Sequence, residues 1–170
     1  MVKPNTSAER SGVDTNNDSV HLIVFRLGEE DFGIPISQIK EVTITPPISR
    51  MPRTPKFIKG VTNIRGDIIA VMSLEERFKI KVSKNLRLPD EQTYTIVTEV
   101  ENYTIGLLVN EVPYSLNVPR DQIEKTPQMI QEIIINEKYI DGIGKVEGSL
   151  IIVLNVPKIL NSQEIKQLAI

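Results

Sequence analysis

The chain has 170 residues, close to the usual size of a single domain, and its 20 lysines and arginines nearly balance its 22 acidic residues. The net charge of -2 gives no reason to expect nucleic acid or an anionic membrane as the main partner. Cysteine is absent, which excludes disulfides, thiolate catalysis and cysteine-ligated zinc, and no apolar run is long enough to cross a bilayer. We therefore expect a cytoplasmic protein that does not insert into a membrane.

Taken in chain order, the pattern predicts short strands and little helix. Residues 1–19 are rich in Ser, Thr, Asn and Asp and are expected to form a disordered tail. Alternating apolar residues predict a β-hairpin over residues 22–36, and the same signature returns over residues 94–109. Further strands are expected at residues 39–45, 68–74, 111–118 and 150–154. A short helix is expected from about Pro157, because the first turn does not need its missing N–H. The prediction is an all-β fold.

The chain also repeats itself. Residues 57–78 match residues 139–160 at an offset of 82, and the two hairpins match at an offset of 73. The difference between these offsets places nine extra residues in the second copy, between about residues 117 and 138. Two pairs of matched glycines are expected to supply positive φ angles or a close backbone approach: Gly60 with Gly142 and Gly66 with Gly148.

The repeat predicts two small β-barrels in tandem, each of about five strands. Residues 20–90 would form the first subdomain, residues 91–160 the second, and residues 161–170 a C-terminal helix or tail. Barrels of this size bury little surface alone, so we expect an apolar seam between them and a groove outside it. The boundary assumes that no strand crosses between the barrels, and the sequence leaves open whether the strand at residues 68–74 does so.

Residues that carry catalysis are missing. The single histidine, His21, lies at the start of the first strand, without the partners that a catalytic base or a metal ligand needs. The acidic groups at residues 29–31 and 75–76 fit a hairpin turn and a helix start, where carboxylates are common. We therefore predict no enzymatic activity, no catalytic residue, no metal site and no cofactor.

One segment, residues 50–65, is basic and rich in proline. It has five basic residues and no acidic one: Arg50, Arg53, Lys56, Lys59 and Arg65. Three interpretations are open: an RNA-binding surface on a small barrel, a solvated loop stiffened by prolines, or a positive patch for an acidic protein partner. RNA binding is disfavoured because only one aromatic residue, Phe57, is present for base stacking, and the repeat pairs it with Tyr139.

The two copies differ at the turn of residues 63–66. The second copy keeps the apolar and glycine positions there but has Lys145 and Glu147 in place of Asn63 and Arg65. Because the fold needs only what both copies share, the asparagine and the arginine are expected to serve another purpose.

Residues 57–66, with the sequence FIKGVTNIRG, closely resemble the F-[IV]-K-G-[VI]-x-N-[IL]-R-G signature of the CheW family, the bacterial chemotaxis coupling proteins. The resemblance covers about residues 20–160. Further motifs agree in the same order at residues 32–41, 105–112 and 139–142.

The resemblance implies a fold of two SH3-like five-stranded β-barrels, in agreement with the repeat. It also implies a signalling scaffold that couples the cytoplasmic tips of chemoreceptors, the methyl-accepting chemotaxis proteins, to the regulatory domain of the histidine kinase CheA. Receptors of this family dock along the groove between the barrels, and the matching receptor-binding positions are Ile39, Glu41, Gly60, Asn63 and Arg65. The matching kinase-binding positions are Gln128 and Met129, at the start of the nine-residue addition.

Arg65 is the strongest candidate among these, because its planar guanidinium can make bidentate contacts with carboxylates on a receptor helix. Ile39 and Gly60 have apolar and glycine counterparts in the second copy, so a purely structural role explains them equally well. Met129 suits an interface because an exposed, flexible methionine adapts to a partner, although it could also fill a gap in the second barrel.

Overall fold

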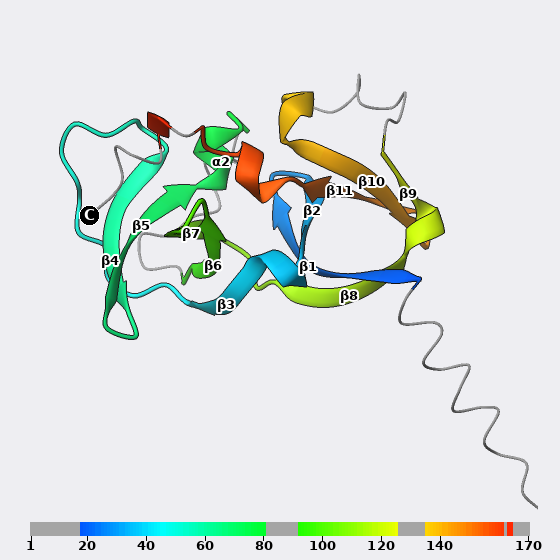
Figure 1. Ribbon diagram of the computed structural model, residues 1–170, viewed down its shortest axis with the longest axis horizontal. Helices are drawn as coiled ribbons and strands as arrows, with labels where there is room; N and C mark the ends of the chain where they lie inside the picture. Colours follow the sequence, from blue (N-terminus) through cyan, green and yellow to red (C-terminus); the bar gives the residue numbers. More distant parts are fainter. Residues whose placement is uncertain (1–17, 81–91, 126–134, 162, 165–170) are drawn as a thin grey trace, which may run out of the picture.

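The computed structural model describes residues 18–80, 92–125, 135–161 and 163–164, which are mostly strands (Figure 1). The strands are β1 (Ser19–Leu27), β2 (Glu30–Pro35), β3 (Ile39–Ile44), β4 (Ile58–Ile64), β5 (Asp67–Ser73), β6 (Tyr94–Val100), β7 (Tyr103–Val109), β8 (Tyr114–Pro119), β9 (Ile123–Glu124), β10 (Ile140–Val146) and β11 (Ser149–Leu154). The helical elements are short: η1 (Ile36–Gln38), α2 (Leu74–Arg77), η2 (Arg120–Gln122), η4 (Glu137–Tyr139) and η5 (Val156–Lys158).

These strands form two curled sheets that lie side by side (Figure 1). The six-stranded sheet has the order β8-β1-β2-β11-β10-β9, and the five-stranded sheet has the order β3-β6-β7-β5-β4. Neighbouring strands are antiparallel except for two parallel pairs, β2 with β11 and β5 with β7. The all-β fold class predicted from the sequence is confirmed.

Each sheet combines strands from both halves of the chain. The hairpin β1–β2 lies with β8 to β11, while the hairpin β6–β7 lies with β3 to β5. A boundary between residues 20–90 and 91–160 therefore does not separate the two sheets. The strand expected at residues 68–74 is observed as β5, which ends at Ser73; it stays with β3 and β4, and the two hairpins exchange instead. The parallel pairs fit this exchange, because parallel neighbours cannot be joined by a tight turn and come from distant parts of a chain.

Some predicted element limits change for local reasons. The strand expected from residue 111 begins only at Tyr114, after Pro113, which has no N–H to donate to a sheet ladder. β1 includes Ser19, the last residue of the expected tail; residues 1–17 lie outside the described residues. The expected C-terminal helix has η5 at its start, with Pro157 in the first turn, and most of residues 161–170 lie outside the described residues.

The glycine predictions are confirmed by the backbone. Gly60, Gly66 and Gly148 have φ angles of 141°, 89° and 81°. At Gly142 the reason is close packing, since a Cβ there would lie 3.1 Å from the carbonyl oxygen of Glu124.

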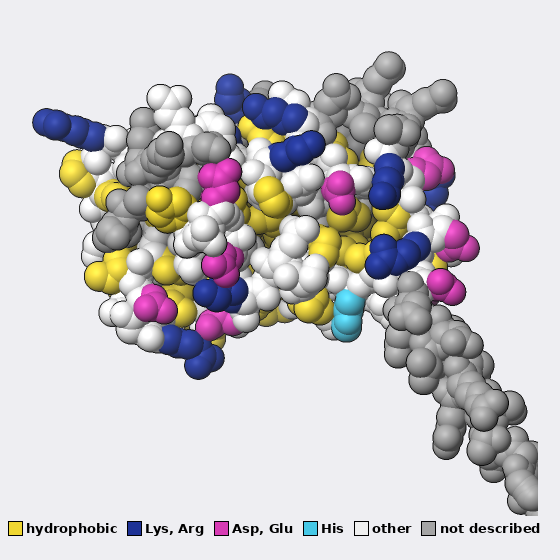
Figure 2. Space-filling model, viewed as in Figure 1, with side chains coloured by type: hydrophobic (Ala, Val, Ile, Leu, Met, Phe, Trp, Pro, Cys, Tyr) yellow, Lys and Arg dark blue, Asp and Glu magenta, His cyan; other side chains and the backbone are white. Residues whose placement is uncertain are grey.

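The predicted apolar seam joins the two sheets. The largest core cluster contains buried residues of the six-stranded sheet, such as Phe32 and Leu154, and of the five-stranded sheet, such as Met72 and Leu107. Each sheet also has a smaller cluster of its own, so many strands are buried on both faces. On the outer surface, Figure 2 shows charged side chains of both signs distributed among apolar ones.

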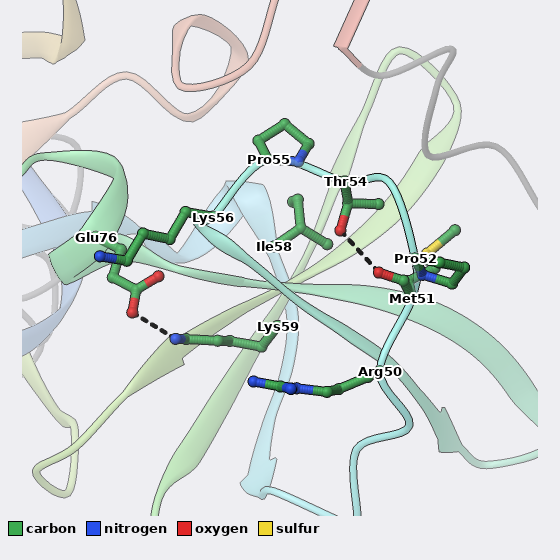
Figure 3. Close-up of a pocket in the computed structure, with 9 residues that line it drawn as sticks. All are labelled: Arg50, Met51, Pro52, Thr54, Pro55, Lys56, Ile58, Lys59 and Glu76. Atoms are coloured by element: carbon green, nitrogen blue, oxygen red, sulfur yellow. Dashed lines mark hydrogen bonds and ion pairs between the residues drawn. The ribbon is translucent and has the colours of Figure 1, made fainter.

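Part of the loop between β3 and β4 lies along the free edge of β4, and residues 50–56 of the loop form an arch beside the start of that strand (Figure 3). Ser49 pairs with Val61 of β4 through two backbone hydrogen bonds of 2.8 Å, and Thr62 donates to the carbonyl of Pro47 at 2.8 Å. Further along the loop, Thr54 Oγ1 donates to the carbonyl of Met51 at 3.1 Å. The loop is therefore held to the sheet rather than only spanning it.

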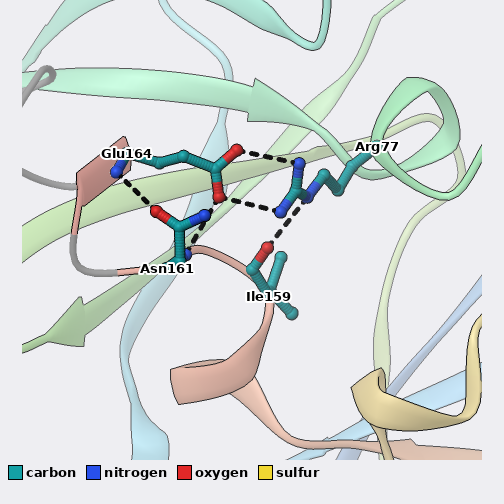
Figure 4. A network of polar contacts seen from close by, with 4 residues as sticks. All are labelled: Arg77, Ile159, Asn161 and Glu164. Carbon is teal, nitrogen blue, oxygen red and sulfur yellow. Dashed lines mark hydrogen bonds and ion pairs between the residues drawn. The ribbon is translucent and has the colours of Figure 1, made fainter.

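Arg77 ties the C-terminal segment to α2 (Figure 4). Its two terminal nitrogens donate to the carboxylate of Glu164 at 3.0 and 2.9 Å, and its Nε donates to the carbonyl of Ile159 at 2.8 Å. The guanidinium also lies over the ring of Phe57, 4.4 Å from its centroid. Both partners of the ion pair are mostly buried, with side-chain exposures of 14% and 21%.

We expect Arg77→Ala to lower the free energy of unfolding by about 2–3 kcal/mol, because it leaves a half-buried carboxylate and a carbonyl without a donor. Arg77→Lys should recover less than half of the loss, since an ammonium cannot reproduce the fork of contacts. Chemical denaturation measures both. Arg65→Ala is the control, an exposed arginine whose loss should cost less than about 1 kcal/mol; equal effects at the two positions would contradict the role of Arg77.

Candidate functional site

The turn of residues 63–66 has the geometry of a tight hairpin. Ile64 pairs with Asp67 across β4 and β5, which leaves Arg65 and Gly66 as a two-residue loop. Both have positive φ angles, 53° and 89°, as a type I′ turn requires. The equivalent loop of the second copy is Glu147-Gly148, with φ angles of 47° and 81°. The turn therefore forms with either residue, so its geometry does not explain why an arginine stands at position 65.

The structure brings Arg65 and Glu41 together, although they are far apart in the sequence. Arg65 Nε lies 2.8 Å from Glu41 Oε2 and 3.1 Å from Glu41 Oε1. Glu41 lies on β3 and Arg65 follows β4, the two edge strands of the five-stranded sheet. The curl of this sheet explains their meeting, because it brings its two edges near each other.

This ion pair is exposed on the arginine side. The side chain of Arg65 is 79% exposed and that of Glu41 is 27% exposed. An exposed pair contributes little to stability. The terminal guanidinium nitrogens of Arg65 make no hydrogen bond within the described residues, so they are available to a partner while Glu41 holds Nε.

Asn63 has a structural task at the same turn. Its Oδ1 accepts a hydrogen bond of 2.9 Å from the backbone N–H of Gly66, and the residue is exposed. We expect Asn63→Ala to lower the free energy of unfolding by about 0.5–1 kcal/mol, because this bond is lost. Asn63→Asp should cost less, since it keeps the acceptor. Denaturant titration tests this, and an alanine variant more stable than the aspartate variant would contradict the assignment.

Gly60 and Ile39 have clear structural roles. Gly60 is buried, and a Cβ there would lie 2.0 Å from the backbone oxygen of Ser49. Ile39 is half-buried and packs against the large core cluster. Of the five predicted receptor-binding residues, only Arg65, Glu41 and Asn63 therefore present polar side chains at this surface, and the binding role of all five stays a prediction.

Exposed apolar residues on the same sheet were missed by sequence reasoning. Val42 and Ile44 of β3 are 38% and 56% exposed, and Ile68 of β5, opposite Asn63, is 56% exposed. In the sequence they look like ordinary strand residues, and no signal there separates them from the core. Val42 and Ile44 alternate with Glu41 along β3 and therefore lie on its other face, whereas Ile68 places apolar contact area beside the Arg65 turn.

The predicted kinase-binding residues, Gln128 and Met129, lie outside the described residues. The segment that leads to them is described as far as Lys125. It contains β9, which is the edge strand beside β10, and Glu124 of this strand pairs with Lys145 at 3.3 Å. The nine-residue addition therefore starts at an edge of the six-stranded sheet.

The other candidate groups take ordinary positions. His21 is exposed on β1, opposite Asn117. Within the part of the chain that the structure describes, no three acidic or histidine side chains gather as a metal site would need. Among the same residues, no helix is long and apolar enough to span a bilayer.

Comparison with known proteins decides the family. The family model of the CheW-like domain matches residues 21–164. The chain belongs to the CheW family. It is 30% identical over 142 residues to the chemotaxis protein CheW of Klebsiella aerogenes, covering 84% of this chain and 82% of that protein. It is 28% identical over 167 residues to the chemotaxis protein CheW of Treponema pallidum, covering 98% of this chain and 96% of the relative.

A solved structure supports the same conclusion. The crystal structure of the scaffolding protein TtCheW from Thermoanaerobacter tengcongensis matches with a TM-score of 0.72 and 30% identity, covering 85% of this chain and 90% of that one. The predicted CheW fold, with two SH3-like barrels and a short helix, is thereby confirmed.

Proposed function

We propose that this CheW-family chain is a chemotaxis scaffold that joins the cytoplasmic tips of chemoreceptors to the histidine kinase CheA, in the cytoplasm and without catalysis of its own. The family match supports the scaffold role. The observation that supports the receptor contact is the Arg65–Glu41 ion pair. The carboxylate of Glu41 fixes Nε of the exposed guanidinium and leaves its two terminal nitrogens available to a partner.

In this proposal the receptor contacts the surface formed by β3 and the turn of residues 63–66. Arg65 binds a receptor carboxylate, and Ile68 of β5, which lies opposite Asn63 beside the turn, buries against an apolar helix face. The kinase contacts the edge of the six-stranded sheet, where the segment containing Gln128 and Met129 begins. Because each contact is separate, modest interfaces suffice once both partners are linked through one chain.

The alternative of an RNA-binding barrel receives no support from the comparisons. In the structure, Lys59 pairs with Glu76 and Arg65 with Glu41. Phe57, the aromatic residue that base stacking would need, lies under Arg77. The basic residues of segment 50–65 are thus partly neutralised by the protein itself.

The test is simultaneous binding. A cytoplasmic receptor fragment and the CheA regulatory domain, both from the source organism, are mixed with the chain and separated by size-exclusion chromatography. We expect one peak that holds all three proteins, and no joint peak of receptor fragment and kinase domain when the chain is omitted. Mutual exclusion of the two partners from the chain would overturn the scaffold.

A further inference from the structure

A basic hollow lies on the five-stranded sheet, away from the Arg65 turn. It has a volume of about 580 Å³ and is bounded by the loop of residues 50–56, by the start of β4 and by Glu76 of α2 (Figure 3). Figure 3 shows the side chains of Arg50, Lys56 and Lys59 extending toward the side of the hollow that holds Glu76. Neither the Arg65–Glu41 surface nor β9 contributes to it.

The charges of this hollow do not cancel. Lys59 and Glu76 form an ion pair, so these two groups are balanced. Arg50 and Lys56 are exposed and have no hydrogen bond or ion pair within the described residues. An excess of two positive charges therefore faces the hollow, in a chain whose net charge is -2. Such a local surplus is complementary to an anionic group.

Apolar walls narrow the choice of anion. Met51, Ile58 and two prolines line the same hollow. An inorganic anion gains nothing from such walls, whereas a carboxylate beside an apolar side chain uses both the cations and the walls. None of the lining residues is aromatic, so the hollow offers no platform on which a nucleic-acid base could stack.

The loop that lines the hollow is also held in place before any partner binds. The bond from Thr54 to the carbonyl of Met51 and the bond of 3.0 Å from the N–H of Ile58 to the carbonyl of Pro55 fix the loop, which Pro52 and Pro55 stiffen further. A fixed loop lowers the entropy lost on binding.

We propose that the basic hollow binds an acidic segment of a partner protein, with carboxylates on Arg50 and Lys56 and an apolar side chain against Met51 and Ile58. This makes a third contact surface, separate from those proposed for the receptor and the kinase. The segment that fits this chemistry is a short stretch in which each Leu or similar apolar residue has Asp or Glu on both sides.

The experiment is an NMR titration of the full, nitrogen-15-labelled chain with the capped peptide acetyl-Glu-Leu-Glu-Glu-Leu-Glu-amide. We expect saturable amide shifts at residues 50–59 and at Glu76, with an affinity that falls as salt rises. The double variant Arg50→Glu and Lys56→Glu should weaken binding at least about tenfold. Arg53→Glu is the matched control, because it changes the same charge in the same loop but does not line the hollow, and it should weaken binding less than about threefold.

Four results would overturn the proposal. These are no saturable shifts at low salt, equal loss in the Arg53 control, equal affinity for the peptide in which every Glu is replaced by Gln, and equal affinity for sulfate or for a short oligouridine. Size-exclusion chromatography of the double variant with the receptor fragment and the kinase domain distinguishes this proposal from the proposed scaffold function. A variant that no longer binds the peptide but still gives the three-protein peak has lost only the function of the hollow.

Discussion

Gly60→Ala is expected to lower the free energy of unfolding by about 3–5 kcal/mol, more than any other substitution considered. A Cβ at this position would lie 2.0 Å from the backbone oxygen of Ser49, and the φ angle of 141° is one that residues with a side chain rarely adopt. The clash involves backbone, so relief requires the Ser49–Val61 bridge to open. Circular dichroism during chemical denaturation measures the loss.

Gly66→Ala is the matched control for this prediction. Its φ angle of 89° is also positive, but a Cβ there meets no atom within 4 Å. Only the backbone strain remains, and the cost should be about 1 kcal/mol. If both alanine variants lost the same stability, the close approach to Ser49 would not be the reason for glycine at position 60. If Gly60→Ala loses stability as expected, weaker receptor binding by this variant reports unfolding rather than the loss of a direct contact.

Arg65→Glu is expected to weaken receptor binding at least about thirtyfold while leaving the fold intact. The change removes the free guanidinium fork and places a second carboxylate beside Glu41. Stability should change by less than about 1 kcal/mol, because the native pair is exposed. Surface plasmon resonance with an immobilised receptor fragment measures the binding, and circular dichroism verifies folding.

A charge swap distinguishes a direct contact from an indirect one. In the double variant Glu41→Arg and Arg65→Glu the ion pair is restored with its polarity reversed. We expect receptor binding to stay weak, since the partner then meets a carboxylate at position 65. Full recovery would show that the ion pair only shapes the turn. Lys40→Glu, an exposed charge reversal on the same strand, should have a much smaller effect.

The strands were predictable because their apolar alternation is local. The two hairpins, the exposed polar turns and the matched glycines all follow from short stretches of sequence, and the repeat predicts two related units. The exchange of hairpins could not be predicted in this way. The apolar pattern of β6 and β7 predicts that they need a buried partner, but β5 and β11 offer similarly apolar strands, and only the packing of the core between the sheets selects β5.

The candidate site was predictable in its residues but not in its geometry. Arg65 stands out because the second copy has Glu147 in the same turn. Its partner Glu41 is 24 residues away, and their contact depends on the curl of the whole five-stranded sheet. The basic hollow was likewise hidden, because the sequence shows a run of positive charge and gives no sign that Glu76 neutralises Lys59.

In the proposed function, this chain gives receptors control over the kinase by holding both. The most direct measurement is CheA autophosphorylation in the presence of receptor-containing vesicles, with the chain, without it, and with Arg65→Glu in its place. We expect receptor-dependent kinase activity only with the wild-type chain, while Arg65→Glu still binds CheA. Equal receptor control of the kinase with and without the chain would contradict the account.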